Sequence, residues 1–223
     1  MKKNKPNILF ILSDQHAFNV IGSYGNKIVR TPNLDELANN GVSFDNIYTP
    51  SPICLPARMS LLTGKYPYRQ ECWMNSDSLA SDIPTMAHSL GSMGYYPTLI
   101  GRLHSIGPDQ LHGFASREVF DHSSDWYGGS EYSLGVLDKA QRPFKESILN
   151  SGAGQMSYEV LDREVTSQTI KFLKNFKAEK ENGDEKPFAL QVGFMLPHQP
   201  YVANKKLFDY YKDKVGSKKK KKT

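Results

Sequence analysis

The chain has 223 residues, of which 39% are hydrophobic, so it can bury a sizeable core and is neither a disordered nor a fibrous protein. Its formal net charge of +5 comes from the lysine run at 218–222, and the near-neutral remainder argues against a nucleic-acid-binding surface. Two cysteines are too few to staple a domain of this size with disulfides. We expect one folded domain over residues 1–215 and a solvated, disordered lysine-rich tail at 216–223.

The run NILFILS at residues 7–13 is apolar throughout and has the length of a strand. Such a run is typical of a central strand that is covered on both faces. The lysines before it resemble the start of a signal peptide, but the run lacks a small-residue cleavage site and leads directly into Asp14. We therefore expect a buried first strand, no membrane span, and a cytoplasmic protein, or a periplasmic or secreted one if a leader has been removed.

Helices are predicted in the following part of the chain. Residues 31–41 carry a threonine and a proline at the start of an apolar periodicity and a glycine at its end, which are common helix boundaries. Residues 42–48 are a candidate short strand. A second helix is predicted from about Pro56 to Gly64, and residues 82–94 repeat the pattern with an acidic cap and a terminal glycine.

The second half of the chain repeats the alternation of strands and helices. Residues 95–101 and 188–196 are strand candidates, and residues 157–178 have apolar side chains at helical spacing. Strands that alternate with helices favour an α/β fold with a largely parallel sheet.

Polar side chains follow three of the predicted strands, at the edge where open α/β sheets bind ligands. They are Asp14, Gln15 and His16 after the first strand, Arg102 and His104 after 95–101, and His198 after 188–196. Each of these residues, taken alone, more often has a structural role. An aspartate after a strand is usually a turn residue, a single histidine is usually structural, and a cysteine such as Cys54 is usually a small buried side chain. Structural roles would not explain why all of these side chains lie at the same edge of the sheet, so we predict that they form one functional site.

Several motifs in order resemble the type I sulfatases of the alkaline-phosphatase-like superfamily. The residues CLPAR at 54–58, followed by SLLTGKYPYR, resemble the family's signature. Four further stretches between residues 6 and about 213 fit: NILFILSDQH resembles the opening strand with its metal ligands, GRLH at 101–104 the Gly-Lys-x-His motif, PHQPY at 197–201 the Pro-His-x-Pro motif, and GPDQLHGF at 107–114 the choline-sulfatase and phosphonate-monoester-hydrolase branch. The resemblance implies an alkaline-phosphatase-like sandwich with helices on both faces of its central sheet.

The resemblance also implies how the site would work. In this family the signature cysteine, here Cys54, is converted by a formylglycine-generating enzyme to an aldehyde whose hydrate attacks sulfur. Arg58 would position the hydrate, His104 would be the base in the second step, and His198 would bind sulfate or protonate the leaving oxygen. Arg102 would bind the sulfate group.

A divalent cation is implied as well, with Ca2+ expected and Mg2+ or Mn2+ as alternatives. Asp14, Gln15 and the modified Cys54 would supply its oxygen ligands, which hard cations prefer. The metal would polarise the sulfate group and favour ionisation of the attacking hydroxyl. The helix start near Pro56 is expected to add backbone N–H donors and a favourable dipole.

Three features depart from the family pattern. Arg102 stands where lysine is usual, so it keeps the charge but does not readily donate a proton. Gln15 replaces a carboxylate seen in many sulfatases, which lowers the negative charge around the metal. The remaining metal ligands and a further lysine lie in a later part of the family sequence than this chain reaches, so we expect an N-terminal portion.

Three functional hypotheses therefore stay open. The first is a sulfuric ester hydrolase that acts on a small-molecule or sugar sulfate ester. The second is a phosphonate or phosphate ester hydrolase of the same superfamily. The third is a catalytically silent fragment; a nucleic-acid partner, acting through the lysine tail, ranks last.

Overall fold

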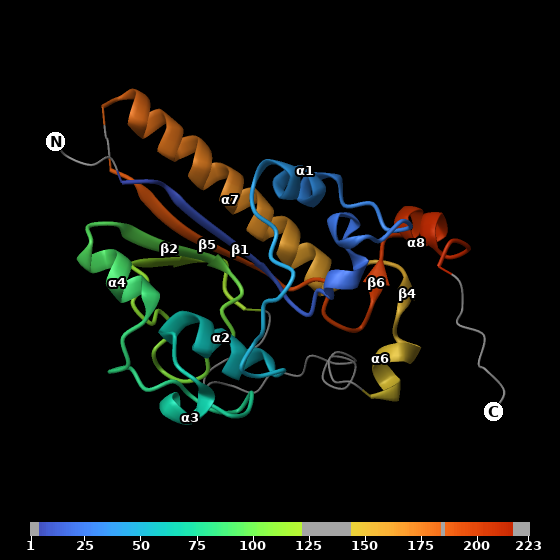
Figure 1. Cartoon of the computed structure of the whole chain (residues 1–223), viewed down its shortest axis with the longest axis horizontal. Coiled ribbons are helices and arrows are strands. Elements are labelled where there is room, and N and C mark those ends of the chain that lie inside the picture. Colours follow the sequence, from blue (N-terminus) through green and yellow to red (C-terminus); the bar gives the residue numbers. More distant parts are fainter. Residues whose placement is uncertain (1–4, 122–143, 184–185, 216–223) are drawn as a thin grey trace. The chain divides into compact units, whose positions relative to one another are not determined.

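The computed structural model describes residues 5–121, 144–183 and 186–215 (Figure 1). The chain divides into two compact units, which are described separately. The first unit comprises Met1–Asp14, Tyr48–Leu134 and Ser157–Leu196, and the second comprises Gln15–Ile47, Gly135–Met156 and Pro197–Thr223. The expected tail at 216–223 lies outside the described residues.

The first unit is built on a parallel four-stranded sheet. The strands, in spatial order, are β1 (Ile8–Ser13), β5 (Phe188–Phe194), β2 (Tyr96–Gly101) and β3 (Ser116–Glu118). β1 pairs in parallel with β5, β5 with β2, and β2 with β3. The predicted α/β class with a largely parallel sheet is confirmed, although β3 was not expected from the sequence.

Helices cover both faces of this sheet, as Figure 1 shows. On one face, α7 (Ser157–Glu181) packs Val165 against a buried cluster that contains Ile100, Leu190 and Val192. The other face carries α2, α3 and α4, which span Cys54–Thr63, Pro67–Gln70 and Met86–Ser92. Their core consists of Leu55, Met59, Leu62, Cys72, Leu79, Ala87, Leu99, Leu103 and Phe114.

The prediction that the first strand is central and covered on both faces is wrong. Among the described strands, β1 lies at the edge of the sheet with β5 as its one neighbour. The side chains of Leu9 and Ile11 are 44% and 54% exposed. A continuous apolar run identifies a strand, but whether a second strand covers its outer edge depends on chain that is distant in sequence.

Three smaller expectations also need correction. Residues 42–48 form no strand. Helix α4 is capped by a Thr85 capping box and not by the acidic residue expected upstream, because the Thr85 side chain and the third helical residue satisfy each other's N–H groups. In α7 the apolar periodicity is imperfect, and Val160 is 55% exposed.

The second unit contains short elements. They are η1 (Phe18–Val20), η2 (Gly22–Tyr24), α1 (Pro32–Asn40), α6 (Lys145–Leu149), β4 (Gly152–Ala153), β6 (Val202–Ala203) and α8 (Lys205–Tyr211). β4 and β6 form a parallel pair. The predicted helix at 31–41 is confirmed with Pro32 in its first turn, but its apolar side chains are not buried.

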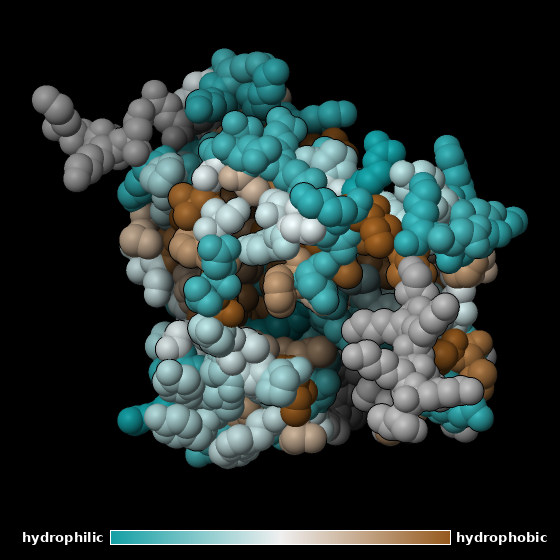
Figure 2. All heavy atoms as spheres, turned by 45° about the vertical axis from the view of Figure 1, so that its right-hand side comes forward, coloured by the Kyte–Doolittle hydropathy of each residue, from teal (hydrophilic) through white to brown (hydrophobic). Residues whose placement is uncertain are grey.

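The surface mixes polar and apolar groups. On the face shown in Figure 2, hydrophobic residues form small groups among hydrophilic ones. No helix within the described ranges combines the length and apolar character needed to cross a membrane.

Candidate active site

Five of the predicted site residues lie in the first unit, at the carboxyl end of its sheet. Asp14 follows β1 directly, and Arg102 and His104 follow β2. Cys54 is the first residue of α2, and Arg58 lies one helical turn further along. The sheet topology therefore brings these side chains together, as expected for the ends of parallel strands.

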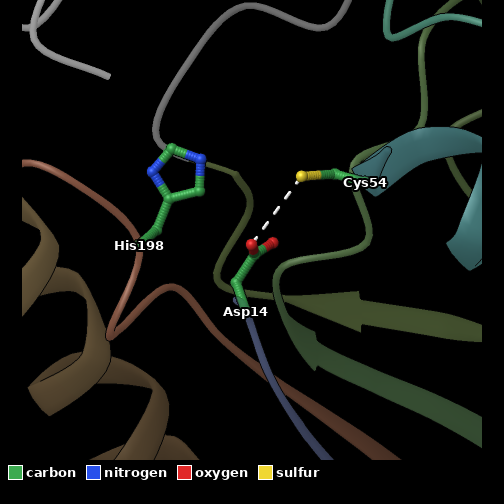
Figure 3. A group of neighbouring side chains, drawn as sticks. All are labelled: Asp14, Cys54 and His198. Atoms are coloured by element: carbon green, nitrogen blue, oxygen red, sulfur yellow. Dashed lines mark hydrogen bonds between the residues drawn. The ribbon is translucent and has the colours of Figure 1, made fainter. Parts of the chain in front are cut away.

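The carboxylate of Asp14 is the centre of this cluster. Its Oδ2 accepts hydrogen bonds from Arg58 Nη2 and Arg102 Nε, each at 2.9 Å. Its Oδ1 lies 3.7 Å from the Cys54 thiol, which donates to it, as the dashed line in Figure 3 shows. The side chains of Asp14, Arg58 and Arg102 are at most 6% exposed, so these ion pairs are screened little by solvent.

Close backbone contact between β2 and β5 sets the position of Arg102. The Arg102 amide donates to the Gly193 carbonyl at 2.9 Å. A Cβ on Gly193 would lie 2.0 Å from the Arg102 carbonyl oxygen, and one on Gly101 would lie 2.3 Å from the Gly193 oxygen. Two glycines are thus needed where the chain leaves the sheet, because any side chain there would push the arginine away.

A second carboxylate, Asp121, organises the same loop and was not anticipated. Its Oδ2 accepts from the amides of Leu103 and His104 at 3.2 and 2.9 Å and from Arg117 at 2.7 Å. Its Oδ1 lies 3.3 Å from Arg102 Nη1. Burial opposes ionisation, but the two guanidiniums outweigh it and hold the pKa of Asp121 well below its usual range.

The signal that could have revealed Asp121 is weak. It comes three residues after the end of the short strand β3, whereas Asp14 follows β1 directly. A strand of three residues leaves little hydrophobic pattern to detect.

Three guanidiniums and two carboxylates form the ion pairs of this cluster among the described residues. The guanidiniums of Arg58, Arg102 and Arg117 share the carboxylates of Asp14 and Asp121. Buried guanidiniums of this kind are suited to bind an anionic ligand.

The Cys54 thiol is not activated as a nucleophile in this setting. Its burial raises the pKa, and the negative charge of Asp14 raises it further; Arg102 and Arg58 only partly oppose this. A thiolate is the reactive form of cysteine, so the unmodified side chain is expected to stay protonated and inert at neutral pH.

The start of α2 offers fewer backbone donors than the sequence suggested. The helix begins at Cys54, and the Leu55 amide already donates to Asn75 Oδ1 at 2.9 Å. Pro56 has no N–H to donate. The expected N–H donors near Pro56 are therefore largely missing, while the helix dipole keeps its favourable sign.

His104 contacts Arg102 through its ring. The Arg102 Nη2 lies 2.8 Å from His104 Nδ1. Burial and the positive charge of Arg102 lower the pKa of His104 to about 3. The backbone of His104 adopts a positive φ of 59°, which is uncommon for a residue other than glycine.

Another residue that the sequence did not reveal, Asp162 on α7, fixes the chain where it leaves β5. Its two carboxylate oxygens accept from the amides of Met195 and Leu196 at 2.7 and 2.9 Å. Burial raises the pKa of Asp162, and these two hydrogen bonds partly offset the rise. Asp162 therefore orients the segment that leads to the histidine motif at 197–201.

Gln15 and His198, the remaining predicted site residues, belong to the second unit. Within that unit, Gln15 Nε2 donates to the Tyr201 hydroxyl at 3.4 Å, and His198 Nδ1 lies 2.7 Å from the Gln199 carbonyl oxygen. His198 is also labelled in Figure 3.

Comparison with known proteins gives a consistent picture. The family described as Sulfatase matches residues 6–223. A choline-sulfatase of Rhizobium meliloti is 36% identical over 218 residues, covering 96% of this chain and 42% of the relative. An arylsulfatase of Clostridium perfringens is 29% identical, with 94% of this chain and 47% of the relative covered.

Among solved structures, the phosphonate monoester hydrolase of Agrobacterium radiobacter has the same fold. It matches with a TM-score of 0.64 at 21% identity, over 96% of this chain and 45% of that chain. The chain thus spans somewhat less than half the length of these relatives.

Proposed function

Because this chain belongs to the sulfatase family, we propose that it forms the nucleophile-bearing part of an enzyme that hydrolyses sulfate monoesters. The observation that carries the proposal is the position of Cys54 at the first turn of α2, facing Asp14 and flanked by two buried arginines. A sulfate ester is an anion, and the guanidinium groups in the cluster complement its charge.

Conversion of Cys54 to formylglycine is part of this proposal. The thiol has a raised pKa, so the unmodified cysteine is a poor nucleophile at neutral pH. The aldehyde formed by a formylglycine-generating enzyme would be hydrated, and its hydroxyl would attack sulfur. Arg58 is placed to orient that hydroxyl, since it lies one turn after Cys54 and is held by Asp14 and the Arg102 carbonyl.

The residues present fit a divalent cation, with Ca2+ as the first choice. Asp14 offers a buried carboxylate whose Oδ1 faces residue 54 while both arginines contact Oδ2. Oxygen donors of this kind suit Ca2+ or Mg2+. Asp14, Gln15 and the modified Cys54 would hold the metal, which would polarise the bound sulfate.

Arg102, His104 and His198 complete the proposed catalytic set. Arg102 is fixed by two carboxylates, so its charge is in position before the ester binds. His104 lies against Arg102 and would contact the same sulfate group. His198 is proposed to bind sulfate or protonate the leaving oxygen, as the family motif at 197–201 implies.

Two alternatives rest on specific observations. The fold shared with a phosphonate monoester hydrolase keeps phosphonate and phosphate esters open as substrates. The coverage of 42% of the choline-sulfatase keeps open a fragment that binds anions without turnover.

Mass spectrometry of the peptide around Cys54 is the first test. The chain would be produced together with a formylglycine-generating enzyme, and we expect Cys54 to be converted to the aldehyde. Cys72, whose burial raises the pKa to about 11, is the matched control and should remain a thiol. An unmodified Cys54 under these conditions would overturn the proposed nucleophile.

Turnover then separates the three functions. Initial rates would be measured with choline sulfate, 4-nitrophenyl sulfate and 4-nitrophenyl phenylphosphonate, with Ca2+ present and with the metal chelated. We expect the sulfates to be preferred, and the Cys54→Ala variant to be inactive. A preference for the phosphonate would favour a phosphonate hydrolase over a sulfatase. A converted chain without any turnover would support the hypothesis of a catalytically silent fragment.

A further inference from the structure

The contact between Arg102 and His104 fixes where the imidazole carries its proton. A guanidinium nitrogen donates hydrogen bonds and cannot accept them. At 2.8 Å from Arg102 Nη2, the Nδ1 atom of His104 must therefore be the acceptor. The proton of the neutral ring then lies on Nε2.

The surroundings also keep this ring neutral. Burial is the largest effect that disfavours the imidazolium, and the charges of Arg102 and Arg58 add to it. Asp121 and Asp14 act in the opposite direction but do not compensate. Burial and repulsion by the guanidiniums destabilise the positive ring more than attraction by the two carboxylates stabilises it.

The backbone on both sides of His104 and the Arg102 side chain are held in place by hydrogen bonds. Asp121 accepts hydrogen bonds from the amides of Leu103 and His104 and also pairs with Arg102. One carboxylate therefore holds both the His104 backbone and the Arg102 side chain. On the other side of His104, the Ser105 hydroxyl contacts His112 Nε2 at 2.6 Å. The uncommon positive φ of His104 is thus supported from both directions.

We propose that His104 acts as a neutral hydrogen-bond donor through Nε2–H, directed at an oxygen of the transferred group, and not as a general base. A base needs a nitrogen lone pair to accept a proton, but Nδ1 is engaged by Arg102 and Nε2 already carries hydrogen. A neutral donor stabilises negative charge that develops on a sulfuryl or phosphoryl oxygen. The role in catalysis rests on the proposed function, whereas the tautomer does not.

Nitrogen-15 NMR of the imidazole rings tests the tautomer directly in the unmodified chain. The six histidines would be labelled, and the His104 signals assigned by their loss in the His104→Gln variant. We expect a neutral Nε2–H ring for His104 at pH 7. A proton on Nδ1, or a doubly protonated ring, would overturn the proposal.

A buried contact of another histidine provides an internal control. His112 Nδ1 lies 3.3 Å from the Asp109 carboxylate, which can only accept, so this ring should show the opposite Nδ1–H tautomer. If both rings gave the same tautomer, the hydrogen bonds would not be setting it, and the proposal would fail.

Substitution tests the catalytic part in the converted enzyme. A glutamine side chain keeps an N–H donor but accepts no proton at neutral pH, whereas alanine lacks both properties. We expect His104→Gln to retain at least tenfold more kcat than His104→Ala, with similar KM for the two variants. Equal kcat values for the two variants would favour a general-base role for His104 and overturn the proposal, even if the wild-type tautomer were Nε2–H. A chain without turnover would count against the proposed function and leave the NMR result standing.

Discussion

The carboxylate of Asp14 is held very differently on its two sides. On one side, Arg58 and Arg102 donate to Oδ2 at 2.9 Å from buried positions, and Arg102 is itself fixed by Asp121. On the other side, the Cys54 thiol makes a single weak contact at 3.7 Å. The guanidinium side is a charged network, while the thiol side is a half-buried small residue at a helix end.

This difference separates the scaffold of the site from its reactive position. Removing one partner of a buried ion pair leaves an uncompensated charge and is costly, so substitutions on the guanidinium side should lower the stability most. The thiol contributes little to the network, so residue 54 can be chemically changed without loss of the surrounding structure. A modifiable nucleophile on a rigid, pre-charged support is the arrangement that electrostatic catalysis requires.

Arg102→Met is expected to lower the free energy of unfolding more than any other substitution proposed below. The change removes a buried cation and leaves carboxylates in a low-dielectric region, which typically costs about 3–5 kcal/mol of unfolding free energy. Urea denaturation followed by circular dichroism would measure it. The control is Arg163→Met, whose side chain is 68% exposed and whose pair with Glu159 is expected to contribute less than about 1 kcal/mol.

A result near the control value would mean that the guanidinium network is solvated and not a scaffold. In that case the contrast between the two sides of Asp14 would disappear.

Asp121→Asn should give the second-largest effect and a distinct pH dependence. The variant keeps the shape and an amide oxygen that can still accept, so only part of the charge-assisted hydrogen bonding to two arginines is lost, about 1.5–3 kcal/mol in total. The pKa of Asp121 is lowered on folding, so its stabilisation is present above the unfolded value of about 4 and is lost as the pH falls below it.

Denaturation of both proteins between pH 7 and pH 2.5 tests the sign. The stability difference should be constant at the upper end and shrink steadily below about pH 4. A difference that stays constant over the whole range would show that the ionised form of Asp121 has no special role.

The sequence predicts much of the fold because local patterns carry it. The strands at 8–13, 96–101 and 188–194 and the long helix at 157–181 all follow from apolar runs or helical spacing. Such patterns do not predict the order in which the strands lie side by side in the sheet. The 8–13 run was placed at the centre of the sheet, yet it lies at the edge of the described strands, because strand neighbours are set by distant chain.

For the site, motif order predicts the nucleophile and its cations but not their support. Cys54, Arg58 and Arg102 were identified from the sequence and lie around Asp14 in the structure. Asp121 was missed because it follows a strand of only three residues and carries no motif. Its importance comes from three contacts with loop residues about 17 positions away, which only the folded structure reveals.

Cys54→Ser should change the free energy of unfolding least, because it alters only the weakly held side of Asp14. Serine keeps a hydroxyl donor toward Asp14 at nearly the same size, and the lost contact is weak, so we expect a change within about 0.5 kcal/mol. The same urea titration measures it, with Cys72→Ser as the matched control. Cys72 is fully buried in the apolar core, and although its thiol donates to the Gln70 carbonyl oxygen at 3.4 Å, replacing the sulfur by the smaller and more polar hydroxyl should cost about 1–3 kcal/mol. Equal losses for both cysteines would mean that Cys54 is a core residue and would remove the distinction between a rigid support and a replaceable nucleophile.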